Sequence, residues 1–357
     1  MAKIRVLFVI NDLSMPGGLA TVTHQLCKDL QHDSIDVKGL TLANKHKHEF
    51  PEYVSYLGMN FLHGISPMKK AMWYFNARRR LEHYLSTSNF DVVIGVGSAM
   101  TMLLTSIHAK GYQVWGTEHS AYANMSVIRK WLKIMCYKRL ERLICLTESD
   151  AILYRRSLKQ VVSIPNYTPY GTTECHCNVK NKHLLYLGRF TKTKGSDYLV
   201  QVVQKFAEDN PDWKISLFGE GPERINVERQ LFYLIDSGQL TVGDPIIDVQ
   251  SEYARSSLLI MTSRNEGFPM VLLEAQAHGI PIVSFDCETG PSEIITNGKD
   301  GYLIPMFDTD TFNQVLASLA KEPDVRERMS KQAIINRKRF SQEAIVNQWQ
   351  KQFKIQL

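Results

Sequence analysis

The sequence predicts an α/β protein in which parallel sheets carry helices on both faces. Short apolar runs rich in β-branched residues recur along the chain, and amphipathic stretches with helical spacing separate them. Strands that alternate with helices in this way pair in parallel through crossover connections. The chain has 357 residues, 44% of them apolar and 22% charged, which suits two domains that each bury a core.

The first half follows this alternation from its start. Residues 3–10, KIRVLFVI, form a continuous apolar run, as expected for a strand covered on both faces. Helical spacing follows over residues 19–30, 67–85 and 125–143. Further strands are predicted at residues 35–43, 91–96, 113–117, 143–147 and 161–165.

The second half repeats the pattern after a polar connecting segment. Residues 166–182 contain Pro and Gly and show no periodicity, which is typical of a linker. Strands are then predicted at residues 183–187, 213–218, 240–243 and 258–262, with helices over 196–208 and 308–339. We therefore expect an N-terminal domain (1–168), a linker (169–182), a C-terminal domain (183–340) and a final amphipathic helix (341–357).

Composition disfavours several classes of protein and site. No run of about 18 apolar residues is present, so no membrane-spanning helix is predicted. The N-terminus leads directly into a strand without a signal-peptide pattern, so we expect a cytoplasmic protein. The six cysteines include no CxxC pair, which argues against a disulfide framework or a zinc site. Cys175-His176-Cys177 lies in the predicted linker and is interpreted as incidental.

The formal net charge of +6 is unevenly distributed. Residues 1–168 carry 21 Lys and Arg against 12 Asp and Glu, whereas residues 169–357 carry 21 against 24. The basic first half therefore needs an anionic partner. Nucleic acid, an anionic substrate and an anionic membrane surface are the candidates.

Residues 263–291 contain the pattern around which a binding site can be built. Glu266 and Glu274 are separated by seven residues, and a helix between them is predicted to begin at Pro269. The backbone N–H groups of Met270 and Val271, with the positive end of the helix dipole, would form an anion site. Carboxylates on either side could accept hydrogen bonds from sugar hydroxyls. The pattern outlines a sugar-nucleotide pocket, although two unrelated surface carboxylates would look similar.

Two loops that leave predicted strands have residues suited to a phosphate or a sugar. Gly17 and Gly18 could present backbone N–H groups, although a turn that needs positive φ gives the same pair. Arg189 and Lys194 lie on one loop and can converge on a diphosphate, the first as a fork and the second as a point charge.

Together these motifs resemble the signature of the retaining glycosyltransferases of family 4. The match includes Glu266, the Gly267-Phe268-Pro269 turn, Glu274, and the Gly-Arg-x4-Lys-Gly loop that starts at Gly188. The resemblance implies the GT-B fold, in which two Rossmann-like β/α/β domains face each other across a cleft. It also implies that the final helix crosses back onto the N-terminal domain.

The resemblance assigns a role to each matched residue. Glu266 would contact the donor sugar, Glu274 would hold the ribose hydroxyls, and Arg189 with Lys194 would neutralise the departing diphosphate. His119, which follows the strand at 113–117, would face the donor sugar, although an isolated His there is often structural. The remaining donor-binding set comprises Gly17, Gly18, Gly188, Gly219, Glu220, Gly221, Gly267, Phe268, Pro269, Met270 and Val271.

Two helical stretches, residues 67–85 and 125–143, combine basic and aromatic residues. In the second, an apolar stripe runs beside several cations. Such a helix can lie on an anionic bilayer, or it can be a core helix with a solvated basic face. The stripe comprises Ile128, Trp131, Leu132, Met135, Leu140 and Leu143, and the cations are Arg129, Lys130, Lys133, Lys138, Arg139 and Arg142.

The expected activity is transfer of a hexose or N-acetylhexosamine from a nucleotide-diphosphate sugar, with UDP as the expected nucleotide. The expected acceptor is a growing glycan, lipid-linked in some relatives, in lipopolysaccharide, O-antigen or capsule biosynthesis. The enzyme would then work at the inner face of the cytoplasmic membrane. The resemblance implies retention by front-face attack without a metal or another cofactor. Asp308-Thr309-Asp310 has the form of a metal-binding DxD motif but is interpreted as a helix N-cap.

Other functions fit parts of the sequence. A sugar-nucleotide epimerase could use the same fold, but it would need an acid/base set that the sequence does not reveal. The basic first half suggests a nucleic-acid-binding protein, but its basic segments lack a recognition motif, so no nucleic-acid partner is expected. The intact Glu266, Glu274, Arg189 and Lys194 argue against an inactive sugar-nucleotide binder.

Overall fold

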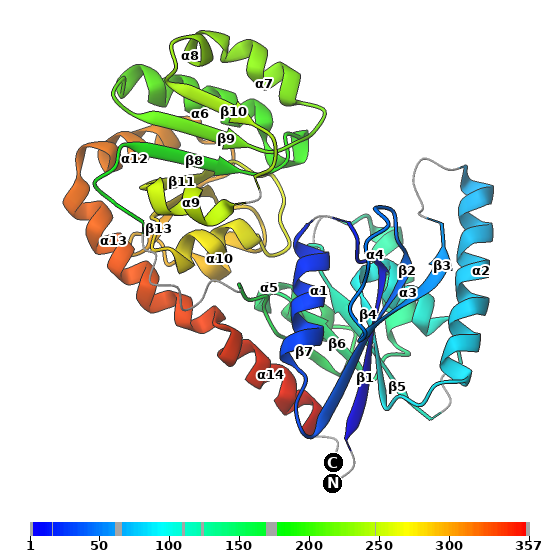
Figure 1. The fold of residues 1–357 in the computed structure, drawn as a ribbon. Coiled ribbons are helices and arrows are strands. Elements are labelled where there is room, and N and C mark those ends of the chain that lie inside the picture. Colours follow the sequence, from blue (N-terminus) through cyan, green and yellow to red (C-terminus); the bar gives the residue numbers. More distant parts are fainter. Residues whose placement is uncertain are drawn as a thin grey trace. The chain divides into compact units, whose positions relative to one another are not determined.

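A computed structural model describes residues 3–15, 17–60, 66–108, 111–122, 125–168, 177–246 and 248–354. The chain divides into two compact units, Met1–Asn166 with Gln342–Leu357, and Tyr167–Ser341 (Figure 1). Each unit is built on one parallel sheet, which confirms the predicted fold class. Within the predicted linker, residues 169–176, and with them Cys175 and His176, lie outside the described residues.

The first unit contains a seven-stranded sheet with the order β3-β2-β1-β4-β5-β6-β7. All of its strand pairings are parallel. The chain winds from β1 toward β3 on one side and from β4 toward β7 on the other, so β1 and β4 flank a switch point of the kind where ligands bind. The strands are β1 (Ile4–Asp12), β2 (Ile35–Ala43), β3 (Val54–Met59), β4 (Val92–Val96), β5 (Gln113–Glu118), β6 (Arg142–Cys145) and β7 (Val161–Ser163).

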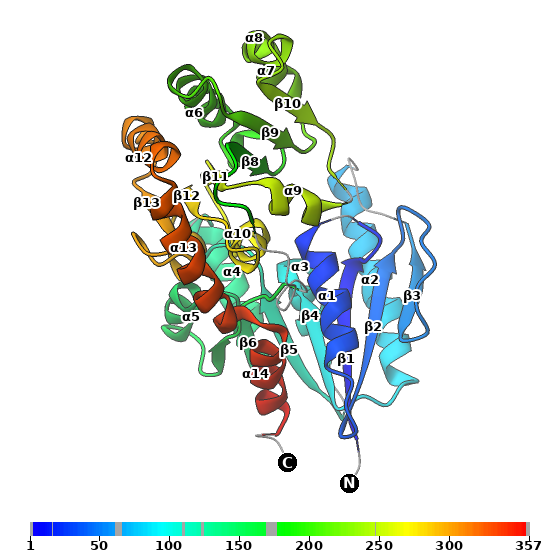
Figure 2. The same ribbon diagram turned by 60° about the vertical axis from the view of Figure 1, so that its left-hand side comes forward.

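Helices cover both faces of this sheet. Leu7 and Val9 of β1 point into a core with α2 and α3, whereas Phe8, which alternates to the opposite face, contacts Trp349 of α14. α14 covers the same face as α1, and the two helices contact each other (Figure 2). The helices are α1 (Gly18–Asp29), α2 (Pro67–Ser86), α3 (Gly97–Thr105), α4 (Val127–Tyr137), α5 (Glu148–Arg155) and α14 (Gln342–Lys354).

The second unit contains a six-stranded parallel sheet with the order β10-β9-β8-β11-β12-β13. The strands are β8 (His183–Leu187), β9 (Lys214–Phe218), β10 (Leu240–Gly243), β11 (Leu258–Met261), β12 (Ile282–Phe285) and β13 (Gly301–Ile304). Its α-helices are α6 (Ser196–Asp209), α7 (Arg224–Gln230), α8 (Phe232–Asp236), α9 (Val249–Arg255), α10 (Met270–Ala277), α11 (Pro291–Ile294), α12 (Thr309–Lys321) and α13 (Pro323–Asn336). Two short 3₁₀ helices, η1 (Lys192–Lys194) and η2 (Arg337–Phe340), complete the unit.

The predicted elements agree with the structure except at a few places. The pattern does not predict β3, an edge strand of mixed polarity, or the short β12 and β13. The helix predicted over 125–143 is wrong beyond Tyr137, because Arg142 begins β6 and the strand pairs with β5 and β7. Asp308 accepts a hydrogen bond from the Thr311 N–H at 3.0 Å, which confirms the N-cap interpretation of that segment.

Candidate functional site

Most of the predicted site residues lie at one edge of the second unit's sheet. β8 pairs in parallel with β9 on one side and with β11 on the other, so the loops that follow these strands leave the same edge. Carboxyl edges of parallel sheets are where ligands of doubly wound folds bind. The three loops cover residues 188–195, 219–223 and 262–269.

Glu266 and Lys194, 72 positions apart in the sequence, form an ion pair at this edge. Lys194 Nζ lies 2.6 Å from Glu266 Oε1 and 2.8 Å from Oε2, and Ser263 Oγ donates to Oε1 at 2.6 Å. The Glu266 side chain is 9% exposed and that of Lys194 is 24% exposed. These donors hold the carboxylate in one orientation, while the ammonium stays accessible to an anionic ligand.

The glycine after Lys194 sets the position of that side chain. η1 ends at Gly195, whose φ of +69° lies in the left-handed region. A Cβ at this position would lie 1.9 Å from the carbonyl oxygen of Thr262, so only glycine fits. Lys192 is exposed, and Lys194 is the lysine of this loop that reaches Glu266.

The two glycine loops pack backbone against backbone. The Phe190 N–H donates to the Glu220 carbonyl oxygen at 2.8 Å. A Cβ at Gly219 would lie 1.9 Å from the carbonyl oxygen of Gly188, and one at Gly221 would lie 2.3 Å from that of Phe190. Close packing therefore accounts for these glycines without a ligand. The side chain of Arg189, on the first loop, is exposed beside them.

α10 begins at Met270, one residue later than predicted, and Pro269 is its N-cap. The ψ of Pro269 is 109°, which is extended rather than helical, so the first helical residues are Met270 and Val271. Their N–H groups lie in the first turn, where no partner exists within the helix. Phe268 is buried and packs edge-on against Phe340, with 5.7 Å between the ring centroids. This contact anchors the turn to η2.

Glu274 has a partner that sequence reasoning missed. The Tyr253 hydroxyl, from α9, donates to Glu274 Oε2 at 2.7 Å. Burial raises the pKa of Glu274 to about 7, and the hydrogen bond from Tyr253 opposes this rise. Glu274 therefore changes charge near neutral pH. A tyrosine two residues before the end of a short helix gives no sequence signal for this contact.

In the first unit, His119 directly follows β5 at the carboxyl edge of the sheet. Its Nε2 lies 2.9 Å from Thr117 Oγ1, and burial lowers its pKa to about 4. The imidazole is therefore neutral at pH 7 and can hydrogen-bond a hydroxyl without adding charge. Gly17 and Gly18 lie at the same edge after β1, where the Gly17 carbonyl accepts from the Thr21 N–H.

The residue before His119 anchors a buried polar network that the sequence does not reveal. Glu118 Oε1 accepts from Ser98 Oγ at 2.6 Å, and Oε2 accepts from the Tyr154 hydroxyl at 2.7 Å. Lys133 of α4 forms an ion pair with the same carboxylate. The Glu118 side chain is 1% exposed and that of Lys133 is 7% exposed. This network joins the end of β5 to α3, α4 and α5.

The orientation of α4 overturns one of the two interpretations of its sequence. Lys133 and Tyr137 face inward, whereas the apolar stripe of the helix faces outward. The core-helix interpretation is therefore wrong for α4, and Leu140 and Leu143 of the predicted stripe lie outside the helix. The outward apolar residues, with exposed fractions from 45% to 81%, are Val127, Ile128, Trp131, Leu132 and Met135.

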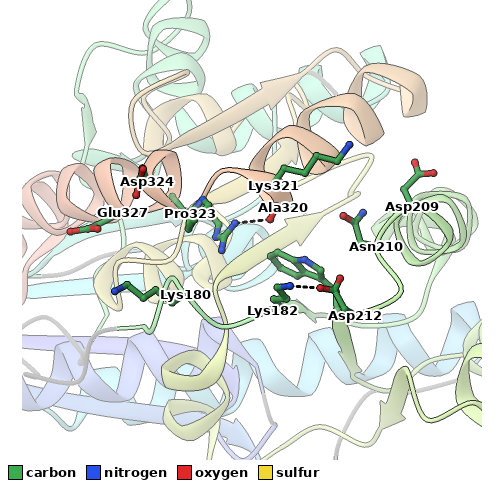
Figure 3. Close-up of a pocket in the computed structure, with 12 residues that line it drawn as sticks. Lys180, Lys182, Asp209, Asn210, Asp212, Ala320, Lys321, Pro323, Asp324 and Glu327 are labelled. Atoms are coloured by element: carbon green, nitrogen blue, oxygen red, sulfur yellow. Dashed lines mark hydrogen bonds and ion pairs between the residues drawn. The ribbon is translucent and has the colours of Figure 1, made fainter.

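A cavity of about 650 Å³ lies elsewhere in the second unit, where the segments leading into β8 and β9 meet α12 and α13 (Figure 3). Arg326 lies over the Trp213 ring, 5.2 Å from its centroid, and donates to the Ala320 carbonyl oxygen at 3.0 Å. Lys182 pairs with Asp212 across the wall. These contacts tie helix ends to strand starts, so the cavity belongs to the framework, at the edge opposite to the predicted site.

Two features are absent from the residues that the structure describes. Among them, no group of three or more His, Cys, Asp or Glu side chains is arranged to hold a metal ion. No helix in these ranges combines the length and apolarity needed to cross a bilayer.

Two family models match consecutive parts of the chain. Residues 16–167 match the model described as Glycosyltransferase Family 4. Residues 176–335 match the model described as Glycosyl transferases group 1. The matched ranges contain every candidate site residue of both units.

Full-length relatives and solved structures agree with these models. An uncharacterized glycosyltransferase from Haemophilus influenzae is 24% identical over 96% of this chain and 98% of its own. The amylovoran biosynthesis glycosyltransferase AmsD from Erwinia amylovora is 27% identical over 97% and 98%. A crystal structure of a Staphylococcus aureus TarM mutant, in complex with fondaparinux, alpha-GlcNAc-glycerol and UDP, superimposes with a TM-score of 0.81 at 14% identity, covering 98% of this chain and 99% of that one.

Proposed function

Because the chain belongs to the family 4 glycosyltransferases with the GT-B fold, we propose that it moves a hexose or N-acetylhexosamine from a nucleotide-diphosphate sugar to a growing bacterial surface glycan. The observation that carries the proposal is the Lys194–Glu266 pair at an edge with an exposed Arg189. In such a pair, the lysine can form an ionic contact with a diphosphate, and the fixed carboxylate can accept hydrogen bonds from a sugar. The epimerase and nucleic-acid alternatives gain no support from the matched families.

The nucleotide of the donor and the class of the acceptor are inferred from the proteins that this chain resembles. UDP is bound in the TarM structure, which favours a UDP-sugar here. AmsD takes its name from amylovoran biosynthesis, which favours a polysaccharide, lipopolysaccharide, O-antigen or capsule acceptor. The basic charge of residues 1–168 suits an acceptor that carries phosphate, such as a lipid-linked glycan.

In the proposed reaction, charge builds up on the departing diphosphate. Arg189, Lys194 and the N–H groups at the start of α10 would stabilise it as it forms, which is the largest single contribution in many transferases. Glu274 would accept hydrogen bonds from the ribose hydroxyls, and Glu266 from the donor sugar. The neutral His119 suits a hydrogen bond to a sugar hydroxyl.

Retention of configuration would follow from front-face attack. The bond between the sugar C1 and the diphosphate oxygen breaks, and a bond from C1 to the acceptor oxygen forms on the same face. The acceptor hydroxyl proton passes to the departing phosphate oxygen. This path needs neither a protein nucleophile nor a metal, since the cations of the second unit supply the positive charge.

The test of this proposal is release of nucleotide from a panel of UDP-, GDP- and ADP-sugars in the absence of acceptor. We expect slow release from one donor, with UDP as product, because water replaces the acceptor in a small fraction of encounters. Calorimetric titration with the free nucleotides identifies the base independently. No release and no nucleotide binding across the panel would refute the proposal.

Nucleotide affinity should depend on pH through Glu274. With a pKa of about 7 in the free protein, Glu274 is mostly protonated at pH 6 and mostly ionised at pH 8. The ionised form accepts two ribose hydroxyls, so calorimetry should show UDP binding up to about tenfold tighter at pH 8. Glu274→Gln should lose this increase, and the phosphate of UDP titrates equally in both proteins. Identical pH profiles for the two would contradict the assigned role.

Glu274 should also make the stability of the folded protein depend on pH. This stability should fall as pH rises, whereas UDP affinity should increase. The folded state keeps the Glu274 proton up to about pH 7, whereas the unfolded chain releases it near its ordinary pKa of 4.5. The unfolded state therefore binds fewer protons between these values, and the stability contributed by this residue falls as pH rises through that range.

The outward face of α4 supports docking on an anionic membrane. α4 contains no Asp or Glu, and its exposed apolar stripe lies beside the exposed Arg129 and Lys138. A helix with this arrangement lies in the interface with its apolar face buried, and each nearby Lys or Arg adds about 1 kcal/mol. Trp131 suits the headgroup region, where aromatic residues are enriched.

Charge placed on this face should abolish docking. The Ile128→Asp/Trp131→Asp variant removes two side chains that would each contribute about 2 kcal/mol on burial. We expect at least tenfold weaker co-flotation with vesicles of phosphatidylcholine and phosphatidylglycerol. Ile152→Asp, which charges an exposed apolar residue of α5, is the matched control and should bind as the wild type does. Equal binding by all three proteins would rule out α4 as the docking element.

A further inference from the structure

A groove of about 500 Å³ lies between α2 and α3 in the first unit. One face of α2 and one face of α3 line it, at the helical spacings expected of two packed helices. Its lining residues are Lys70, Tyr74, Phe75 and Arg78 from α2, and Ala99, Met102, Leu103 and Ser106 from α3. None of these eight residues is acidic.

Two cations stand at the α2 side of the groove. Lys70 and Arg78 are both exposed, and they are eight residues apart on one face of α2, about 12 Å along its axis. Tyr74 lies between them, half-buried. Two long side chains at this spacing can converge on one phosphate above the tyrosine ring, with Arg78 as a fork and Lys70 as a point charge.

Apart from Ser106, the rest of the groove lining is apolar, and further apolar side chains are exposed on α2. Phe75, Met102 and Leu103 belong to this lining, and Phe75 is 60% exposed. On α2, Met68 and Met72 are 74% and 60% exposed. α3 contacts both α2 and α4, so the groove lies in the same helix layer as the outward stripe of α4. A small water-soluble ligand in the groove would leave these apolar side chains exposed to water. The acyl chains of a lipid would cover them.

From this combination we infer that the α2–α3 groove binds the phosphate of an anionic lipid, whose chains cover the apolar rim. The inference rests on the proposed membrane docking and adds a specific headgroup site to it. The charge of the groove complements a phosphate, and its position places that phosphate beside a helix face suited to a bilayer. The occupant is a lipid of the membrane rather than a free phosphate, because inorganic phosphate would use only Lys70 and Arg78.

The test is calorimetric titration with dihexanoyl phosphatidic acid, kept monomeric so that no bilayer is present. We compare Lys70→Ala/Arg78→Ala with Lys69→Ala/Arg79→Ala. Lys69 and Arg79 are equally exposed on α2 but do not line the groove, so both variants lose the same charge. We expect Kd to rise at least tenfold in the groove variant and less than twofold in the control. Dihexanoyl phosphatidylcholine and inorganic phosphate should each bind at least tenfold more weakly than the phosphatidic acid.

Equal losses in the two variants would show diffuse attraction and overturn the inference. Equal binding of inorganic phosphate, or no binding of the phosphatidic acid to the wild type, would overturn it as well. Nucleotide release from the donor, measured without lipid, should match the wild type in both variants. If the wild type neither releases nor binds a nucleotide, the transferase proposal alone is refuted, and if the wild type does not co-float with vesicles, membrane docking alone is refuted.

Discussion

The Glu266→Gln variant is expected to release nucleotide from the donor at about one hundredth of the wild-type rate or less. Glu266 accepts hydrogen bonds from Lys194 and Ser263 and is nearly inaccessible, so its charge and orientation are both set by these contacts. An amide keeps the shape but loses the charge, and it leaves the Lys194 ammonium without its counter-ion. Removal of one fixed electrostatic group from an active site commonly lowers the rate by about 10² to 10³.

The size of this effect is checked by acceptor-free nucleotide release, with matched variants in parallel. Glu208→Gln, at an exposed position of α6, removes the same charge outside the site and should stay within twofold of the wild type. Glu266→Gln/Lys194→Met should lose little more than the worse single variant, because paired groups that act as a unit are not additive. If the Glu266→Gln variant kept more than half of the wild-type rate, Glu266 would have no role in the reaction.

The second-unit site could be anticipated because its residues follow strands. Parallel strands end at a common edge, so residues that follow predicted strands, such as Arg189, Lys194 and Glu266, lie at that edge. The structure brings Lys194 and Glu266 together, a pairing that the sequence pattern does not predict, and leaves Arg189 exposed on the same loop as Lys194. The spacing of the glycines also predicts the positions of the loops. The close packing of Gly219 against Gly188 and of Gly221 against Phe190 nevertheless explains these glycines without any ligand.

The parts that escaped prediction depend on tertiary packing. Tyr253 reaches Glu274 from another helix, and no local pattern encodes that approach. The stripe on α4 identifies an amphipathic helix but not its rotation, since an apolar face normally packs inward. Here the pairing of Lys133 with Glu118 selects the opposite rotation. β3 escaped because an edge strand needs no continuous apolar run.

The Lys133→Met variant is expected to destabilise the first unit by about 3 kcal/mol or more. It leaves the buried Glu118 carboxylate without its cation, with the hydroxyls of Ser98 and Tyr154 as hydrogen-bond donors among the described residues. Removal of one partner of a buried ion pair commonly costs about 3–5 kcal/mol, because the other charge stays desolvated. Urea unfolding followed by tryptophan fluorescence reports mainly on this unit, since it holds four of the five tryptophans: Trp73, Trp115, Trp131 and Trp349.

Two companion variants separate the ion pair from the charge of α4. Lys138→Met removes an exposed lysine at the C-terminal end of α4 and should change stability by less than about 0.5 kcal/mol. Glu118→Gln/Lys133→Met removes both charges of the pair and should recover at least half of the loss, since well-packed neutral replacements of a buried pair are often tolerated. If the double variant were as unstable as Lys133→Met, the loss would come from packing at α4. Recovery would instead show that the loss comes from the Glu118 carboxylate that Lys133→Met leaves without its cation.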